Sequence, residues 1–243
     1  LNMRRNIWIK KRIDRRLYQL FQSKKNVPKK AQQFLKNITL EEFWRYYLAD
    51  GDSPHYHLPW QGKEMTKFPM DIFLYQKLVH DAHPDIIIEI GTQRGSSALF
   101  LASLIEPYGG TVITLDLLSP KEEVMEEFSR HNVVFIQGDA TSSEVAHRVL
   151  EYARGKRCFV IDDGSHRESD VLRAFLHYES LVPVGGYYII EDGLSGQLCG
   201  PSTHNALIAV DLILTEHNNW IRSQKYASFI FFTAFLGILQ KVK

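Results

Sequence analysis

From residue 70 onward, short and continuous apolar runs alternate with longer segments in which apolar residues recur at helical spacing. Continuous apolar runs are typical of strands that are buried on both faces of a parallel sheet, and the segments between them are typical of helices that cover such a sheet. The pattern predicts strands at 85–91, 111–117, 133–140, 158–164 and 186–193. It predicts helices at 70–82, 96–109, 120–131, 143–155, 168–182 and 202–218.

The end of the chain is rich in residues that favour strands. The segments KYASFIFFT (225–233) and FLGILQKV (235–242) predict two strands joined by a tight turn. With the five earlier strands they make a seven-stranded, mostly parallel sheet with one antiparallel strand and helices on both faces. The predicted fold class is therefore α/β and Rossmann-like.

The first part of the chain lacks this alternation. We interpret residues 1–38 as a basic helical arm and residues 39–243 as one catalytic domain. A helix is predicted at 39–47, where Thr39 is a suitable N-cap followed by acids, and residues 49–69 are predicted to form a glycine- and proline-containing loop.

Charge is distributed unevenly along the chain. The formal net charge is only +1, yet residues 1–36 hold twelve lysines and arginines against one acid, Asp14, which leaves the remainder acidic. Apolar residues are interleaved with these bases, so an amphipathic helix is expected that packs on a neighbouring subunit of a homo-oligomer. Weak contact with a membrane surface is an alternative, whereas no groove-reading motif supports a specific nucleic-acid partner.

Composition narrows the class of protein further. Hydrophobic residues make up 44% of the chain, which suffices for a full core, and the two cysteines, Cys158 and Cys199, form no CxxC pair. Neither a disulfide framework nor a cysteine zinc site is expected, which favours a reducing, cytoplasmic location. The longest apolar stretch, residues 226–239, is short for a membrane span and no secretory signal is recognised.

Acidic residues stand at the end of every predicted strand of the parallel sheet. They are Glu89, Asp116, Asp139, the pair Asp162 and Asp163, and the pair Glu191 and Asp192. In open α/β sheets, ligands bind beyond the carboxyl ends of the strands. Because charge is unfavourable in a sheet interior, this row of acids predicts a ligand site at that edge.

The first strand leads into a glycine loop, Glu89-Ile-Gly91-Thr92-Gln-Arg94-Gly95-Ser96. The spacing differs from the dinucleotide GxGxxG, and the Lys-Ser/Thr of a phosphate loop is missing, which favours a nucleoside without phosphates, S-adenosylmethionine. Asp116 is suited to bind the ribose hydroxyls and Asp139 to bind the adenine amino group. The predicted cofactor contacts on these strand ends are Glu89, Gly91, Thr92, Gly95, Ser96, Asp116, Asp139, Ala140 and Asp162.

Two longer stretches carry a family resemblance. Residues 59–102, PWQGKEMTKFPMDIFLYQKLVHDAHPDIIIEIGTQRGSSALFLA, and the later IDDGSHRESDVLRAF and VPVGGYYIIEDG resemble the cephalosporin hydroxylase-like family of class I methyltransferases, which includes rhamnosyl O-methyltransferases. The later motifs are also similar to the metal-dependent macrolide-sugar O-methyltransferase of mycinamicin biosynthesis. Ser96 departs from the second glycine that many relatives carry.

The resemblance implies an S-adenosylmethionine-dependent O-methyltransferase and assigns roles to particular residues. It implies that Asp163, Glu191 and Asp192 hold Mg²⁺ and that His166 serves as the base. It also places Lys67, Tyr75 and Arg94 near the cofactor.

Elementary chemistry agrees with that implication. Three carboxylates suit Mg²⁺, which lowers the pKa of a bound hydroxyl, and a nearby histidine can take the proton. We therefore expect methylation of a hydroxyl on a glycoside or another natural product. The alternatives are a hydroxylase or methoxylation component of antibiotic biosynthesis and a non-catalytic scaffold that binds S-adenosylmethionine.

Overall fold

The computed structural model describes residue 39 and residues 59–193, 206–226, 233–234 and 236–243. The chain divides into two compact units, Leu1–Tyr46 and Tyr47–Lys243. Every described element belongs to the second unit. The predicted arm at 1–38 and all of the predicted helix at 39–47 except Thr39 lie outside the described residues. No helix in the described part of the chain is long and apolar enough to cross a membrane.

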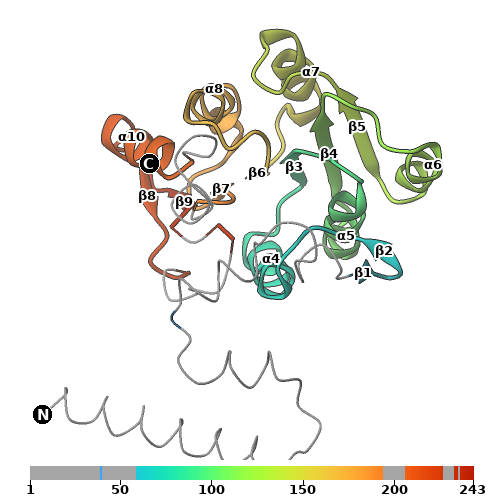
Figure 1. Ribbon diagram of the computed structural model, residues 1–243. Helices are drawn as coiled ribbons and strands as arrows, with labels where there is room; N and C mark the ends of the chain where they lie inside the picture. Colours follow the sequence, from blue (N-terminus) through green and yellow to red (C-terminus); the bar gives the residue numbers. More distant parts are fainter. Residues whose placement is uncertain (1–38, 40–58, 194–205, 227–232, 235) are drawn as a thin grey trace, which may run out of the picture. The chain divides into compact units, whose positions relative to one another are not determined.

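A seven-stranded sheet forms the centre of the second unit (Figure 1). Its strands are β3 (Ile86–Ile90), β4 (Thr111–Asp116), β5 (Val133–Gln137), β6 (Cys158–Asp162), β7 (Tyr187–Ile190), β8 (Trp220–Arg222) and β9 (Ile238–Lys241). The spatial order is β5-β4-β3-β6-β7-β9-β8, and β9 alone runs antiparallel to the other strands, between β7 on one side and β8 on the other. The predicted sheet of seven strands with one antiparallel member is confirmed.

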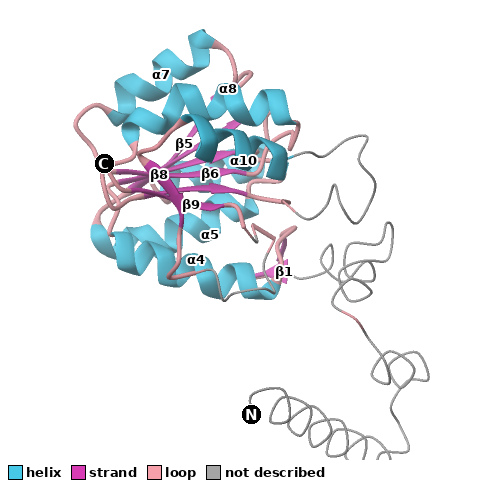
Figure 2. Ribbon diagram, turned by 90° about the vertical axis from the view of Figure 1, so that its left-hand side faces the viewer, coloured by secondary structure: helices cyan, strands magenta, loops and turns pink. Residues whose placement is uncertain are grey.

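Helices cover both faces of this sheet (Figure 2). They are α4 (Pro69–Ala82), α5 (Ser96–Ile105), α6 (Glu122–Arg130), α7 (Ser143–Ala153), α8 (Glu168–Tyr178) and α10 (Ala206–Glu216), with short 3₁₀ turns η2 (Glu106–Tyr108) and η3 (Glu179–Leu181). Helices α4 and α5 lie on one face, and α7, α8 and α10 lie on the other. The predicted helices between residues 70 and 182 are confirmed apart from small shifts at their ends, and the helix predicted at 202–218 is confirmed over Ala206–Glu216. Pro120, for example, lies before the N-cap Lys121 of α6 instead of in its first turn.

Two hydrophobic cores flank the sheet, one on each face. In β3, Ile86, Ile88 and Ile90 belong to the core beneath α7, α8 and α10, whereas Ile87 belongs to the core beneath α4 and α5. Successive side chains of a strand point to opposite faces, so a strand covered on both faces must be apolar throughout. This explains the continuous apolar runs in the sequence, and it makes the polar edge of the sheet stand out.

The last strand pair differs from the prediction. The strand beside β9 is Trp220–Arg222, where the sequence predicted none, Gln224–Tyr226 form a turn, and residues 227–232 of the predicted strand lie outside the described residues. Trp220 is buried, its indole donates a hydrogen bond to Glu179 Oε2 at 3.0 Å, and its ring packs edge-on against Phe175. These contacts with α8 and η3 come from distant sequence, so strand propensity alone did not indicate this strand.

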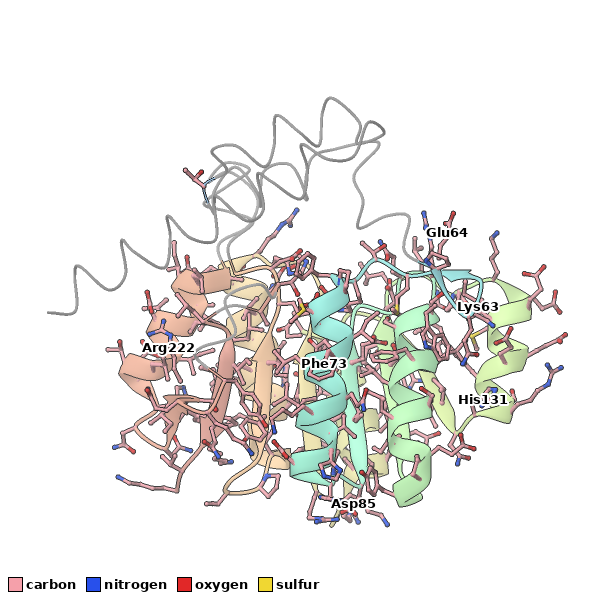
Figure 3. The ribbon with its side chains drawn as sticks, turned by 90° about the horizontal axis from the view of Figure 1, so that it is seen from below. Lys63, Glu64, Phe73, Asp85, His131 and Arg222 are labelled. Atoms are coloured by element: carbon pink, nitrogen blue, oxygen red, sulfur yellow. The ribbon has the colours of Figure 1, made fainter. Side chains whose placement is uncertain are left out.

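The predicted loop at 49–69 contains a small hairpin in its described part, β1 (Pro59–Trp60) and β2 (Lys63–Glu64). Gln61 and Gly62 have φ angles of 50° and 79°, which a tight two-residue hairpin turn requires. Figure 3 places Lys63 and Glu64 at the end of the sheet opposite Asp85, which precedes β3. The hairpin thus brings the following residues, including the buried Lys67, to the carboxyl edge of the sheet.

Candidate functional site

A cleft of about 810 Å³ lies at the carboxyl ends of the parallel strands. Residues from the loops after β3, β4, β5, β6 and β7 line it, together with residues 64–68 after the hairpin. The predicted site residues that line the cleft are Lys67, Gly91, Thr92, Arg94, Gly95, Ser96, Asp116, Asp139, Ala140, Asp162, Asp163, His166, Glu191 and Asp192. Glu89 does not line it, because its side chain points into the sheet interior, where it is buried.

The glycine loop after β3 packs directly against the loop after β6. Gly91 has a φ of 98°, and a Cβ there would meet the backbone oxygen of Asp163 at 2.2 Å. Gly95, with a φ of 81°, is the N-cap of α5, and a Cβ there would meet the Val124 side chain at 2.6 Å. Only glycine allows both this backbone conformation and this close approach. Gly91 therefore brings the loop within reach of the acids that follow β6, and Gly95 lets α5 begin close to α6.

Glu89 supports the glycine loop from below. Its Oε2 accepts a hydrogen bond from Thr114 Oγ1 at 2.6 Å, and Thr114 Oγ1 lies 2.6 Å from Thr92 Oγ1. Thr114 uses its single hydroxyl hydrogen on Glu89, so Thr92 must donate to Thr114. Burial raises the pKa of Glu89 to about 6 although Ser97 and Thr114 donate hydrogen bonds to it. Glu89 thus orients Thr92, which does line the cleft.

Backbone amides hold two carboxylates at the side of the cleft expected to take the nucleoside. Asp116 accepts hydrogen bonds from Gln93 N at 2.8 Å and from Leu118 N at 3.1 Å. Asp139 Oδ1 accepts from both the amide and the hydroxyl of Thr141 at 2.8 Å. Arg94, which was expected near the cofactor, is paired with Glu64 of the hairpin.

A buried ammonium lies between two of the predicted metal ligands. Lys67 Nζ is 2.5 Å from Asp163 Oδ2 and 2.5 Å from Glu191 Oε1, and Lys67 itself is 5% exposed. Tyr75 also donates a hydrogen bond to Glu191 Oε1. Burial opposes the charged form of Lys67, but the carboxylates of Asp163 and Glu191 outweigh it and raise its pKa well above the ordinary value. Lys67 is therefore a permanent cation.

The other oxygen of Glu191 belongs to a second buried group. Thr233 Oγ1 lies 3.0 Å from Glu191 Oε2 and 3.0 Å from Asp71 Oδ2, and the Thr233 amide donates to Asp71 Oδ1 at 3.0 Å. A hydroxyl has one hydrogen, so it donates to one carboxyl group and accepts from the other. Burial and then the Glu191 charge raise the pKa of Asp71 well above the ordinary value, which favours Asp71 as the carboxyl group that donates to Thr233.

His166 and Asp192 complete the cluster on the other side of Asp163. His166 Nε2 lies 3.7 Å from Asp163 Oδ1 and 3.4 Å from Asp192 Oδ2. One ligand atom from each of these three residues lies within 4.8 Å of the others, so the group could hold a metal ion. Both His166 and Asp192 have left-handed backbones, with φ angles of 55° and 54°. Such conformations are unfavourable for residues with side chains and gather at functional sites.

Negative charge in the cluster exceeds what Lys67 compensates. Burial and the Glu191 charge together raise the pKa of Asp163 to about 7, although Lys67 and His166 act in the opposite direction. Burial also raises the pKa of Asp162 to about 6, and its Oδ2 atom has no hydrogen-bond partner among the described residues. Acids that resist ionisation in this way indicate a site for an additional cation.

The structure adds residues that sequence reasoning missed. Asp71, Thr114 and Thr233 bear on the cluster or on the glycine loop, but none belongs to a motif. Asp71 stands in the first turn of α4, where an acid is ordinary, because its side chain accepts a hydrogen bond from the Phe68 amide at 2.9 Å. Only the fold brings Thr233 from the end of the chain to this acid.

Comparison with known proteins settles the family. The family model for rhamnosyl O-methyltransferase/CmcI matches residues 53–235, which is more than half of the chain. The chain belongs to this family. The sequence resemblance to rhamnosyl O-methyltransferases is thereby confirmed.

Curated relatives agree with that family. A rhamnosyl O-methyltransferase of Mycobacterium leprae is 25% identical over 154 residues, which is 63% of this chain and 66% of the relative. A rhamnosyl O-methyltransferase of Mycobacterium tuberculosis is 25% identical over 170 residues, which is 67% of each chain. The chain thus spans about two thirds of the length of these relatives.

Solved structures confirm the fold. CmcI, in a structure described as "Mg-SAM", superposes with a TM-score of 0.61 at 19% identity, covering 90% of this chain and 88% of that one. MycE of the mycinamycin pathway, in complex with Mg and SAH, superposes with a TM-score of 0.48 at 22% identity, covering 70% of this chain and 49% of that one. The second unit of the chain therefore has the Rossmann-like fold of S-adenosylmethionine-dependent O-methyltransferases.

Proposed function

We propose that the protein is an S-adenosylmethionine-dependent O-methyltransferase that acts on a hydroxyl group of a sugar or glycoside and uses a divalent cation, Mg²⁺. One observation carries the proposal. The acid cluster around Asp163, with His166 beside it, lies in the same cleft as the glycine loop and Asp116. A methyl donor at the glycine loop and an acceptor hydroxyl at the acid cluster can thus be bound side by side in one cleft.

For the cofactor, the donors and acceptors on β3, β4 and β5 suit a nucleoside. Asp116 offers a carboxylate to the ribose hydroxyls, and the backbone amides that already hold it keep it in place. The left-handed Gly91 holds the glycine loop against the Asp163 backbone, and both loops line the cleft. A relative of this fold, CmcI, is described with SAM, which supports this assignment.

The acid cluster fits a divalent cation. Asp163 and Asp192 present carboxylate oxygens close together, and hard oxygen ligands are those that Mg²⁺ prefers. Glu191 and Asp163 both contact the ammonium of Lys67, so a single cation can already bridge these two carboxylates. Asp163, Glu191 and Asp192 would hold the ion. When bound, Mg²⁺ lowers the pKa of an acceptor hydroxyl.

The chain's own residues supply the proton transfer. His166 lines the cleft, and Asp163 and Asp192 orient its ring. The ring can therefore take the proton of the acceptor hydroxyl, and the two carboxylates stabilise the positive charge that the ring then carries. Lys67 and Tyr75 cannot serve as the base, because their raised pKa values keep them protonated. The deprotonated oxygen then attacks the sulfonium methyl group, whose carbon–sulfur bonding electrons remain on S-adenosylhomocysteine.

The two alternative functions gain no support from the site. An iron-dependent hydroxylase of the common type uses two histidines and one carboxylate, whereas the group found in the described residues has one histidine and two carboxylates. A non-catalytic scaffold would not need a costly acid cluster in the same cleft as the glycine loop. A glycoside acceptor and a homo-oligomer with the basic arm at its interface remain predictions.

Chelation tests the proposal. Purified protein is freed of metal with EDTA and assayed for methyl transfer from S-adenosylmethionine to a panel of glycosides, by mass gain, before and after Mg²⁺ is returned. Activity should vanish with chelation and return with Mg²⁺. Asp116→Ala should weaken S-adenosylhomocysteine binding at least about tenfold, since a charged hydrogen bond contributes about 1.5–3 kcal/mol. Full activity after chelation would exclude the metal mechanism.

A further inference from the structure

The ammonium of Lys67 stands where a cation for the acid cluster would be expected. It contacts one oxygen of Asp163 and one of Glu191, each at 2.5 Å, and these acids arrive on neighbouring strands, β6 and β7. Among the described residues, no other lysine or arginine pairs with either acid. The surrounding structure fixes the position of Lys67, which follows the hairpin, is almost fully buried and has its Nζ atom 5.7 Å from the centre of the Tyr75 ring.

In Asp163 and in Glu191, one carboxylate oxygen contacts Lys67 and the other contacts a different residue. Asp163 turns Oδ2 to Lys67 and Oδ1 to His166. Glu191 turns Oε1 to Lys67 and Oε2 to Thr233, so both of its oxygens are engaged within the protein. A divalent ion that uses Glu191 must therefore share an oxygen with Lys67 and Tyr75 or with Thr233.

We propose that Lys67 is the resident counter-cation of the metal-free centre and that it competes with the divalent ion for Asp163 and Glu191. The inference rests on the proposed function, because it assumes that the divalent ion binds these acids. Lys67 is then a positioning residue. It keeps the acids in place and the fold stable without metal, and it weakens divalent binding so that the ion remains exchangeable.

Electrostatics sets the direction of the effect. A positive charge within a few ångströms of a divalent ion in a partly buried site repels it by several kcal/mol at an effective dielectric constant of about 20. Its removal leaves Asp163 and Glu191 without a fixed cation, which destabilises the metal-free protein. A divalent ion should then both bind more tightly and restore the lost stability.

The experiment compares Lys67→Met with the unchanged protein and with Lys67→Arg, which keeps the charge. Mn²⁺ affinity is measured by electron paramagnetic resonance, and the melting temperature is measured in EDTA and in saturating Mn²⁺. Lys77→Met is the matched control, because it removes an ammonium that pairs with Asp81 outside the cleft. Lys67→Gln, which keeps a hydrogen-bond donor, provides a second neutral variant if Lys67→Met does not fold.

We expect the neutral variants to bind Mn²⁺ at least about tenfold more tightly, whereas Lys67→Arg and Lys77→Met stay within about twofold of the unchanged protein. Mn²⁺ should raise the melting temperature of the neutral variants more than that of the unchanged protein. Unchanged or weaker Mn²⁺ affinity in both neutral variants would overturn the inference, as would a loss of stability that Mn²⁺ does not restore. If the unchanged protein binds no Mn²⁺, the metal part of the proposed function fails together with the inference. If it binds Mn²⁺ but the neutral variants bind no more tightly, only the inference about Lys67 fails.

Discussion

At the scale of single residues, the site depends on which groups are charged and which are neutral. Two carboxylates raise the pKa of Lys67, burial and the Glu191 charge raise the pKa of Asp71, and Tyr75 donates a hydrogen bond to Glu191. His166 lines the cleft beside these groups, with Nε2 at 3.4 Å from Asp192 Oδ2 and 3.7 Å from Asp163 Oδ1. The assignment of the base therefore follows from its neighbours.

His166→Ala tests that assignment. Turnover should fall by about 10²–10⁴, the usual contribution of a general base, while Mn²⁺ affinity and S-adenosylhomocysteine affinity stay within a few-fold of the unchanged protein. Turnover should recover partly at high pH, where the acceptor hydroxyl ionises without help. A pH–rate profile with parallel binding measurements checks this. Equal turnover in the variant at neutral pH would remove His166 from the mechanism.

Glu89 offers a prediction on stability and pH. Burial raises its pKa in the folded protein from 4.5 to about 6, so the folded state binds more protons than the unfolded state between these values. The contribution of Glu89 to stability is therefore fully present below about pH 4.5 and is lost as the pH rises through about 6. Glu89→Gln should escape that loss and gain about 1–2 kcal/mol relative to the unchanged protein between pH 4.5 and 7.

Urea unfolding at several pH values measures this difference. Glu123→Gln, at an exposed position of α6, is the control and should show no such change with pH. A Glu89→Gln variant whose relative stability is the same at pH 5 and pH 7.5 would contradict the assignment of a raised pKa to Glu89.

At the scale of elements, the site is a junction of loops that the sheet holds in register. Ile90 pairs with Asp162 across β3 and β6, and the Asp163 amide donates to the Ile90 oxygen at 2.9 Å. This pairing brings the glycine loop and the acid loop together. The same pairing of β6 with β7 sets Asp162 beside Ile190, and hence Asp163 near Glu191.

Gly91→Ala should disrupt this junction. A Cβ at Gly91 would stand 2.2 Å from the Asp163 backbone oxygen on a chain already at a φ of 98°, so we expect a loss of more than about 3 kcal/mol and loss of cofactor binding. Gly155→Ala is the control. It also has a positive φ, 71°, but open space around it, and should cost about 1–2 kcal/mol with cofactor binding retained. Chemical unfolding and calorimetry measure both.

At the scale of the whole second unit, the cleft exists only when the sheet is assembled. Its lining comes from residues as distant in sequence as Glu64 and Thr233. A ligand of this cleft therefore binds the folded state and not the unfolded chain, so it must stabilise the fold by mass action.

S-adenosylhomocysteine should therefore raise the melting temperature. At about 100 times its dissociation constant it adds about 2.7 kcal/mol, which corresponds to about 5–10 °C for a domain of this size. Asp116→Ala at the same ligand concentration should show a clearly smaller rise, and Asp192→Asn should show nearly the full rise, because it lies outside the nucleoside contacts. Equal shifts in all three proteins would place the cofactor elsewhere.

The local patterns of the sequence determined the α/β class, the five parallel strands, and the acids at their ends. These features are readable because a sheet covered on both faces needs largely apolar strands, so acids near the ends of such strands stand out, even where one of them, Glu89, is buried within β3. The DDGSH and IIED motifs likewise indicated Asp163, His166, Glu191 and Asp192, which the structure brings to one cleft.

Tertiary structure alone decided the strand before β9, the hairpin ahead of α4 and the partners of the acids. Trp220 forms a strand because of its contacts with α8 and η3, which no local propensity contains. Asp71, Lys67 and Thr233 meet Glu191 only in the folded chain, at separations of 120, 124 and 42 positions that carry no periodic signal. The charge state of a buried acid depends on such neighbours, and it is therefore a property of the fold.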